Sequence, residues 1–283
     1  MRTILVPTDF SKCSLQAVKY AIQFAQKTER KIIFFHSTFL LIPTRSSTRS
    51  YLYSVKSDKD NKMKFLIQFI DDAYHSLNIK RDQFRTKFMI KFGNSAVKNI
   101  METINEQFID LIIMGTHGSS GFRKILFGSN AIKVIEQAYC PVLAVPAKFK
   151  FKSIDKIAYA GSDIDKLKKE LKSVVQIARN LNASIDIVHI ASGSKLKMKS
   201  ENFEVDKFVI TLSKQLKFYN FGFYIIDGKG RSLADEINKF VAHQKSDMLV
   251  MRTKKRGSFD KLFYPSQTAE LAYNLNLPLL AVK

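Results

Sequence analysis

The sequence predicts an α/β fold with two tandem open parallel sheets of five strands each and helices on both faces. The first observation is that short apolar runs alternate with helical segments, an order that produces parallel sheets covered on both sides. The second is an internal repeat. Residues 110–146 (DLIIMGTHGSSGFRKILFGSNAIKVIEQAYCPVLAVP) align without a gap on residues 247–283 (DMLVMRTKKRGSFDKLFYPSQTAELAYNLNLPLLAVK), and residues 4–37 resemble residues 157–190.

The repeat predicts two related units, residues 1–147 and 152–283, joined by the short basic segment AKFKFKS (147–153). A chain of 283 residues suits two domains of ordinary size better than one. Hydrophobic residues make up 46% of the chain and charged residues 25%. This is a normal globular balance, so each unit has enough apolar side chains for a core of its own.

The first elements follow from the hydrophobic pattern. Residues 2–7 and 31–37 are short apolar runs of strand length. Between them, apolar side chains recur at helical spacing through residues 11–28. The next segment, residues 38–60, is polar, rich in Ser and Thr and long for a connection. It is therefore predicted to be a flexible or functional loop.

The rest of the first unit continues the alternation. Residues 61–77 have the pattern of an amphipathic helix and residues 84–93 alternate as a strand does. A further helix is predicted to begin at Asn94, a residue type that caps helices. The unit then has five predicted strands (2–7, 31–37, 84–93, 109–114 and 141–146) and four predicted helices (11–28, 61–77, 94–107 and 129–138).

The second unit repeats this plan. Its stretch at 192–202 is short and basic, in the place of the long polar segment of the first unit. Its predicted strands are 156–161, 184–190, 218–227, 247–251 and 277–283, and its predicted helices lie near 164–181, 202–216, 231–245 and 266–275.

The charge balance indicates an anionic partner. The formal net charge is +21, from 46 Lys and Arg against 25 Asp and Glu. Nucleic acid, an anionic membrane surface and a nucleotide all fit this charge. The alternative is a solvated, lysine-rich surface with no partner.

The cysteines and the apolar runs indicate the compartment. Cys13 and Cys140 have no metal-ligand spacing and are too few for a disulfide framework, which predicts a reducing, cytoplasmic location. The opening MRTILVPTDFS lacks the pattern of a secretory signal. No stretch approaches the roughly 18 consecutive apolar residues that span a bilayer, so we expect no membrane partner.

The segment GTHGSSGFRKILFGS (115–129) is a candidate anion site. It leaves a predicted buried strand and enters a predicted helix. The free N–H groups of the first helical turn and the helix dipole favour an anion there, and glycine lets a ligand approach the backbone closely. The spacing matches neither the Walker loop nor the G-x-G-x-x-G of dinucleotide folds. A plain glycine-rich turn is the alternative.

Asp9 follows the first predicted strand, in VPTDFS. If that strand lies at the centre of the sheet, Asp9 lies beside the glycine segment and its carboxylate can accept hydrogen bonds from ribose hydroxyls. The alternative is that Asp9 caps the helix that follows. The two roles do not exclude each other.

These residues resemble the universal stress protein family, whose ATP-binding members carry G-x2-G-x9-G-[S/T]. Gly115, Gly118, Gly128 and Ser129 match that spacing in full. The segments ILVPTDFS and PVLAVP are also similar to the family, and the resemblance covers both units. It implies a strand order of 3-2-1-4-5 in each unit. It also implies pairing of the two units through their last strands, with a homodimer left open.

The resemblance also implies the site residues. Contacts to adenine and ribose fall on the ends of the first two strands, and contacts to phosphate fall on the glycine segment and the helix after it. The cofactor implied is ATP, with magnesium as an accompanying ion, and no residue is assigned as catalytic or as a metal ligand. The implied binding residues are Pro7, Asp9, Ser37, Met114, Gly115, His117, Gly118, Gly128, Ser129, Asn130 and Ala131.

The second unit departs from the motif. The three glycines are replaced there by Arg252, Lys255 and Pro265, and Ser266 alone is kept. Side chains at these positions block close backbone approach and make positive φ costly. We therefore expect one ATP per chain, and we expect the three glycines to serve ligand binding more than folding. The basic stretch TKKRGS (253–258) is a rival anion site or a solvated loop.

The sequence thus predicts a nucleotide-binding regulatory protein of the stress response, with ATP held by the first unit. The first alternative is an ATP-independent basic module that binds nucleic acid or another anionic partner. The second is a slow ATP hydrolase, for which Asp9 and His117 are the only obvious catalytic candidates.

Overall fold

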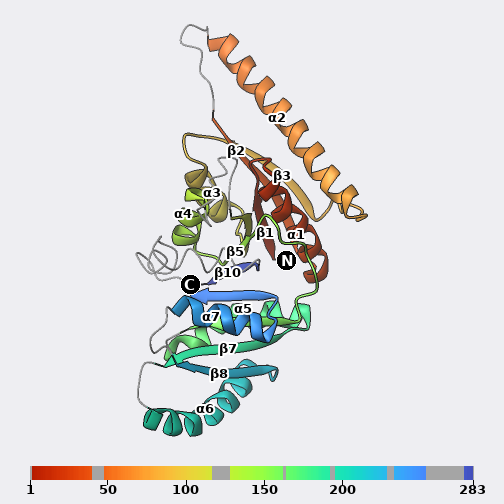
Figure 1. Cartoon of the computed structure of the whole chain (residues 1–283). Coiled ribbons are helices and arrows are strands. Elements are labelled where there is room, and N and C mark those ends of the chain that lie inside the picture. Colours follow the sequence, from red (N-terminus) through yellow and green to blue (C-terminus); the bar gives the residue numbers. More distant parts are fainter. Residues whose placement is uncertain are drawn as a thin grey trace. The chain divides into compact units, whose positions relative to one another are not determined.

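The chain forms two compact units, Met1–Phe151 and Lys152–Lys283. The computed structural model describes residues 2–39, 48–116, 128–161, 164–191, 195–227, 233–252 and 277–282. Each unit holds a twisted sheet with helices packed against it (Figure 1). The predicted α/β fold class is confirmed in both units.

The sheet of the first unit is parallel, and its strand order is β3-β2-β1-β4-β5. The predicted 3-2-1-4-5 order is therefore correct, and β1 lies at the centre with β2 on one side and β4 on the other. The order reverses between β1 and β4, which makes their carboxyl ends the switch point of the sheet. The strands are β1 Thr3–Pro7, β2 Lys31–Thr38, β3 Thr86–Phe92, β4 Leu111–Gly115 and β5 Val142–Val145.

The helices of this unit cover both faces. α1 (Lys12–Thr28) packs beside α2 (Thr48–Ser76), and α3 (Ala96–Glu106) packs beside α4 (Ser129–Gln137), with the strands between the two pairs (Figure 1). α3 begins at Ala96, two residues after the predicted start at Asn94. Its N-cap is Ser95 rather than Asn94, and the Ser95 hydroxyl accepts a hydrogen bond from Lys98 N.

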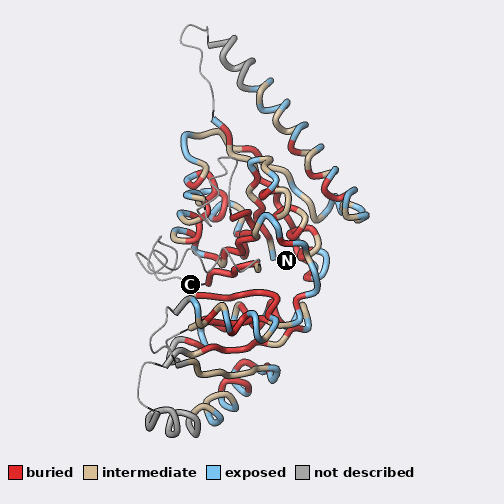
Figure 2. The backbone as a smooth tube through the Cα atoms, viewed as in Figure 1, coloured by how far each residue is buried: buried red, intermediate tan, exposed pale blue. Residues whose placement is uncertain are grey.

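The predicted loop at 38–60 is wrong in its second half, because α2 already begins at Thr48. Figure 2 shows buried positions in the part of α2 near the sheet. Among the described side chains of α2, residues 56–65 are exposed or half-buried, and the buried ones begin at Leu66 and continue with Ile70. A stretch of helix with no buried face has no apolar period, so periodicity does not reveal it.

The second unit has the same topology, with strand order β8-β7-β6-β9-β10. The predicted stretch at 192–202 is partly helical, because α6 begins at Lys195. The predicted helix at 266–275 lies outside the described residues. The elements are β6 Lys156–Ala160, α5 Ile164–Leu181, β7 Ser184–Ala191, α6 Lys195–Leu216, β8 Phe221–Asp227, α7 Leu233–Gln244, β9 Met248–Arg252 and β10 Leu279–Val282.

An aspartate shared by the two halves of the repeat fastens the start of each central strand. Asp110 Oδ2 accepts a hydrogen bond of 2.8 Å from Thr3 N at the start of β1. Asp247 Oδ2 accepts one of 3.0 Å from Lys156 N at the start of β6. These N–H groups lie at strand ends, where the neighbouring strands offer them no carbonyl. The aspartate carboxylate therefore serves as their hydrogen-bond acceptor. The match of Asp110 to Asp247 in the repeat therefore serves the fold.

The basic segment predicted as a joint is held on the first unit by aromatic packing. Phe149 is 5% exposed, and its ring lies 5.9 Å from that of Tyr20 on α1. The Phe151 ring lies 5.0 Å from the same Tyr20 ring, with Lys27 Nζ 5.4 Å from the Phe151 centroid. The alternating Phe and Lys residues of AKFKFKS therefore lie on opposite sides of the segment. The Phe rings pack against α1, and the Lys side chains are exposed.

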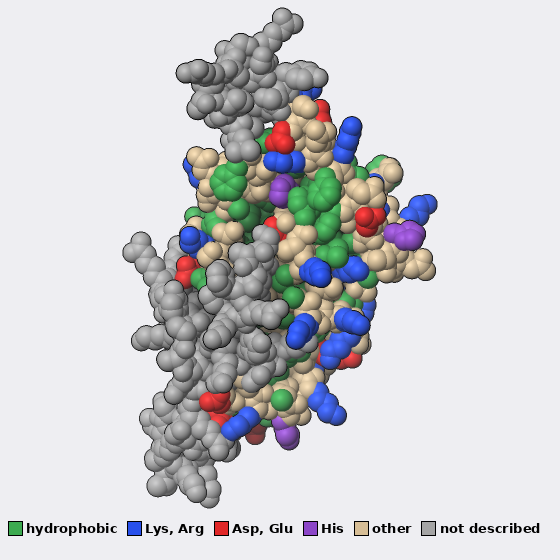
Figure 3. All heavy atoms as spheres, turned by 45° about the horizontal axis from the view of Figure 1, so that its top comes forward, with side chains coloured by type: hydrophobic (Ala, Val, Ile, Leu, Met, Phe, Trp, Pro, Cys, Tyr) green, Lys and Arg blue, Asp and Glu red, His purple; other side chains and the backbone are tan. Residues whose placement is uncertain are grey.

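The described surface is rich in basic side chains. On the face drawn in Figure 3, Lys and Arg outnumber Asp and Glu, in line with the net charge of +21. Within the part of the chain that the structure describes, no helix combines the length and hydrophobicity that crossing a membrane requires.

Asp186 is a buried carboxylate in the middle of β7. It is 5% exposed, and its Oδ2 has no hydrogen-bond partner. Burial raises the pKa of Asp186, an effect that nearby Lys156 partly offsets. The repeat places Ile33 of the first unit at this position, so the sheet itself does not require a polar side chain here.

We expect the second unit to lose stability as pH rises, because of Asp186. A raised pKa in the folded state means that folding favours the protonated acid. The stabilisation is full below the ordinary carboxyl pKa of about 3.9 and is lost as pH rises through the raised value. The variant Asp186→Asn is therefore expected to gain stability over the wild type toward neutral pH, by roughly 1–3 kcal/mol. Amide hydrogen exchange of β7 at several pH values measures this, and a difference that does not grow with pH would contradict it.

Candidate functional site

The carboxyl ends of β1 and β4 form one side of a pocket in the first unit. This is the switch point of the sheet, where open parallel sheets bind ligands. The cavity volume is about 140 Å³, roughly ten times what one water molecule needs. The lining comes from strand ends and from the first turns of helices: Pro7, Thr8, Asp9, Ser14, Phe35, Ser37, Ala96, Ile100, Met114, Gly115, Thr116, Gly128, Ser129, Asn130 and Ala131.

The structure places around this pocket every predicted site residue that it describes. Two of the predicted residues, His117 and Gly118, lie outside the described residues. The others come from three separate parts of the chain and meet only in the fold: Pro7, Asp9, Ser37, Met114, Gly115, Gly128, Ser129, Asn130 and Ala131.

The N-terminus of α4 faces the pocket without a side-chain cap. α1 and α3 are capped by the hydroxyls of Ser11 and Ser95, whereas the N-cap of α4 is Gly128, which makes no side-chain cap bond. Ser129 and Asn130, the first helical residues, are exposed. The N–H groups of this first turn therefore point to the pocket with the positive end of the helix dipole, an arrangement that binds anions.

Gly128 does not adopt a positive φ, so the expectation that a glycine is needed at this position for positive φ is wrong. Its φ is −61° and its ψ is 152°, an extended conformation that other residues adopt. Its N–H donates a hydrogen bond of 2.6 Å to the carbonyl of Thr116, which joins the two ends of the glycine segment. Proline cannot make this bond, and proline stands at the matching position 265 of the second unit.

Gly115 serves the fold directly, which corrects the expectation that the three glycines serve ligand binding more than folding. A Cβ at position 115 would lie 3.0 Å from Cys13 Sγ and 3.1 Å from both the carbonyl carbon and the carbonyl oxygen of Cys13. Two of these contacts are with backbone, so a side chain would push the start of α1 away from β4. Close packing of α1 on β4 is therefore one reason for this glycine.

The second unit fills the matching position with a buried ion pair. Arg252 Nε lies 2.9 Å from Glu170 Oε1 on α5, and the Glu170 side chain is 4% exposed. The hydroxyl of Tyr159 on β6 donates to the other carboxylate oxygen of Glu170. In the repeat these three residues match Gly115, Ala17 and Val6. The second unit has thus replaced a close helix–strand contact by a polar network.

Asp9 does not cap α1, so that alternative is wrong. The N-cap is Ser11, whose side chain accepts a hydrogen bond from Ser14 N. Asp9 is exposed at the pocket mouth, and its Oδ1 accepts a hydrogen bond of 3.1 Å from Ser11 N. This bond fixes the turn after β1 and holds the carboxylate at the rim.

The turn at Asp9 is shaped by Phe10, which sequence reasoning missed. Phe10 has a φ of 63°, in the left-handed region that costs a residue with a side chain about 1–2 kcal/mol. Its ring packs against His36, Phe65 and Phe69 at centroid distances of 4.4, 4.7 and 5.3 Å. This aromatic cluster offsets the backbone strain beside Asp9.

His36 fastens the same turn from β2. Its Nδ1 lies 2.9 Å from the carbonyl oxygen of Thr8, and because a carbonyl only accepts, Nδ1 carries the proton. Burial lowers the pKa of His36 and Lys62 lowers it further, which outweighs the opposing effects of the hydrogen bond to Thr8 and the charge of Asp9. The imidazole is therefore neutral near pH 7 and acts as a structural donor.

Ser37 on β2 is held by Asn99 on α3, another residue that sequence reasoning missed. Asn99 Nδ2 donates a hydrogen bond of 2.8 Å to Ser37 Oγ, and Asn99 is 5% exposed. A signal was present in the sequence: Asn99 lies on the face of its helix that Val97, Ile100 and Ile104 bury. A polar residue within an apolar stripe indicates a specific partner.

Comparisons with known proteins agree on one family. The model of the universal stress protein family matches residues 1–146 and 154–283. Universal stress protein MJ0531 of Methanocaldococcus jannaschii is 29% identical over 149 residues, which are 51% of this chain and 81% of that protein.

Two solved structures are similar. A universal stress protein from Archaeoglobus fulgidus has a TM-score of 0.71 at 18% identity, covering 99% of this chain and 98% of its own, which is a likeness of fold. A universal stress protein in complex with cAMP has a TM-score of 0.39 at 24% identity, covering 51% of this chain and 96% of its own.

Proposed function

Because the chain belongs to the universal stress protein family, we propose that it is a nucleotide-binding regulatory protein of the stress response whose first unit holds ATP. Nucleotide-binding members of the family are known. The observation that carries the proposal is the first turn of α4, which lacks a side-chain cap and faces a pocket lined by the predicted residues.

The pocket has the polarity that a nucleotide needs. In the proposed pose the phosphates lie against the N–H groups of Ser129, Asn130 and Ala131 at the start of α4. Asp9 and Ser37, at the ends of β1 and β2, lie across the pocket and take the ribose and the base. His117 and Gly118 add contacts to the phosphates in this proposal, with magnesium as the accompanying ion.

We propose that the site binds ATP without efficient hydrolysis, so that ATP is retained as a signal and its bound state is the regulatory output. General acid–base catalysis needs positioned proton donors and acceptors. Asp9 is the only ionisable carboxylate among the described lining residues, and His117, the other catalytic candidate, lies outside the described residues.

Isothermal titration calorimetry is expected to give one ATP per chain. Gly118→Lys, which places the residue of the second unit in the first, is expected to weaken binding by about tenfold or more because a bulky side chain then occupies the glycine segment. The matched control is Lys255→Gly, which makes the reverse exchange and is expected to leave the stoichiometry at one. Two equivalent sites in the wild type, or full affinity in Gly118→Lys, would refute the proposal.

A further inference from the structure

We propose that Asn99 is a positioning residue that turns the Ser37 hydroxyl into a hydrogen-bond donor for a ring nitrogen of adenine. The inference rests on the proposed function, since it concerns the base of the nucleotide in the same pocket. It adds a chemical role for Asn99, which does not itself line the pocket.

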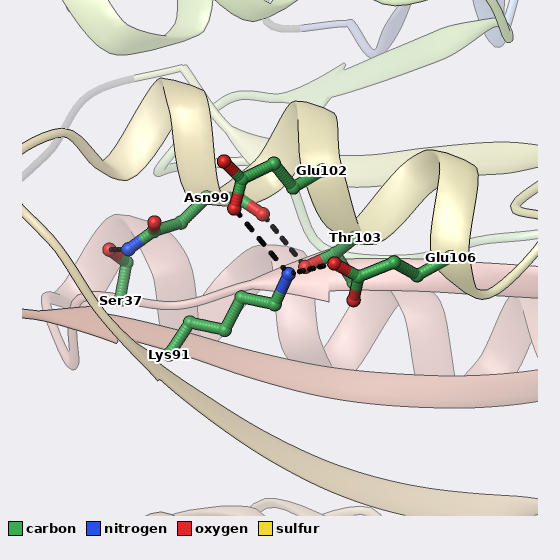
Figure 4. A network of polar contacts seen from close by, with 6 residues as sticks. All are labelled: Ser37, Lys91, Asn99, Glu102, Thr103 and Glu106. Carbon is green, nitrogen blue, oxygen red and sulfur yellow. Dashed lines mark hydrogen bonds and ion pairs between the residues drawn. The ribbon is translucent and has the colours of Figure 1, made fainter.

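The geometry places Asn99 behind Ser37. The amide of Asn99 reaches from α3 toward the end of β2, where its Nδ2 lies 2.8 Å from Ser37 Oγ (Figure 4). Ser37 lines the pocket, whereas Asn99 is 5% exposed. The asparagine therefore acts on a ligand only through the serine.

The hydrogen bond sets what Ser37 presents to the pocket. A hydroxyl has one proton to donate and two lone pairs. Asn99 Nδ2 is itself a donor, so it occupies a lone pair of Ser37 Oγ and leaves the serine proton for another acceptor. On the pocket side that acceptor is the ligand.

The position of Ser37 in the sheet indicates which part of the ligand it contacts. Ser37 is on β2, which lies on the opposite side of β1 from β4. The start of α4, where the phosphates are proposed to bind, follows β4 along the chain. A nucleotide laid across the ends of β4, β1 and β2 brings its base to Ser37.

The amide of Asn99 has little freedom to move. A Cβ at Gly93 would lie 2.6 Å from Asn99 Oδ1, so the amide is confined between Gly93 and Ser37. Thr103 Oγ1 donates a hydrogen bond of 2.7 Å to the backbone carbonyl of Asn99, which holds the main chain of α3 at this residue.

The helix that carries Asn99 is also tied to the sheet. Lys91 on β3 pairs with Glu106 at 2.7 Å and lies 3.7 Å from Glu102, both on α3 (Figure 4). Pre-organisation of this kind increases the selectivity of a single hydrogen bond.

Adenine is the base that fits such a donor. It offers the unprotonated ring nitrogens N1, N3 and N7, each of which accepts one hydrogen bond. ATP analogues in which one of these nitrogens is replaced by C–H (1-deaza, 3-deaza and 7-deaza) test the donor atom by atom, since each removes a single acceptor.

The expected result is that one of the three analogues binds the wild-type chain about five- to tenfold more weakly than ATP, the range of one net hydrogen bond. In Ser37→Ala that penalty is expected to vanish, with ATP and the analogue binding alike. In Asn99→Leu the loss of affinity is expected to shrink by at least half, because no donor then occupies the lone pair of Ser37 Oγ and the serine proton is no longer directed toward the ligand. Thr103→Val, which perturbs the same helix but not the Ser37 hydroxyl, is expected to keep the full penalty.

The outcomes separate this inference from the proposed function. The donor role is refuted if the wild type binds ATP but each of the three analogues has the same affinity relative to ATP in the wild type as in Ser37→Ala. If Ser37→Ala loses the penalty while Asn99→Leu keeps it, Asn99 does not position the hydroxyl. If the wild type binds no ATP, the proposed function fails, and this inference fails with it.

Discussion

Replacing Gly128 by aspartate is expected to weaken ATP binding by about 100-fold, because the carboxylate competes with phosphate for the same N–H groups. Gly128 is the N-cap of α4 and makes no side-chain cap bond. Its φ of −61° and ψ of 152° are the extended values in which a capping side chain reaches the first turn. The new carboxylate also repels the phosphates at short range, which adds to the loss.

Stability separates this effect from misfolding. An aspartate cap is expected to leave the unfolding free energy of the first unit unchanged or raise it by a few tenths of a kcal/mol. Gly128→Asn is the matched control, since asparagine caps equally well without charge, and it is expected to lose only about tenfold in affinity. Calorimetric titration with ATP and amide exchange of α4 measure the two properties. A stable Gly128→Asp variant with full affinity would show that the phosphates do not bind at α4.

The fold could be predicted because each step rests on local patterns. Apolar runs of strand length and helical spacing between them need no knowledge of distant contacts. The repeat then doubled the evidence, since the same order of elements occurs twice. The hidden part was the first half of α2, whose described side chains from residue 56 to residue 65 are exposed or half-buried and so give only a weak apolar period in the sequence.

The residues of the candidate site likewise fall into those that the sequence reveals and those that it does not. Residues in a spaced motif, such as Gly115 and Gly128, are visible in the sequence alone. Phe10 and Asn99 are not, because their roles depend on contacts with His36, Phe65 and Ser37 from other elements. Their partners become neighbours only when the sheet order is known. The residues that position a site are therefore harder to predict than those that line it.

Gly115 shows that a sequence difference between the two units has more than one physical cause. The loss of glycine in the second unit suggested a lost ligand contact. The structure adds a packing reason, since a Cβ at 115 would press on the backbone of Cys13. Arg252 is tolerated because α5 presents Glu170 where α1 presents Ala17. The substitution at 252 and the one at 170 are thus a coupled pair.

That coupling predicts a large effect in the second unit. Arg252→Gly is expected to destabilise it by about 3 kcal/mol, the lower end of the range for removing one partner of a buried ion pair. The lower end applies because Arg252 is 25% exposed, whereas Glu170 is 4% exposed. Glu170 would keep its bond from Tyr159 but would lose its cation. Because a chain with two units need not unfold in one step, amide hydrogen exchange resolved to β9 and α5 is the suitable measurement.

A second substitution tests whether the buried charge is the cause. Adding Glu170→Gln to Arg252→Gly removes the uncompensated carboxylate but leaves the lost packing of the arginine side chain. The double variant is expected to recover roughly 1–2 kcal/mol relative to Arg252→Gly, which is a coupling within the range for residues in contact. ATP binding by the first unit is expected to stay unchanged in both variants, since neither position lies in it. A loss below 1 kcal/mol in Arg252→Gly, or no recovery in the double variant, would show that the pair with Glu170 does not stabilise the second unit.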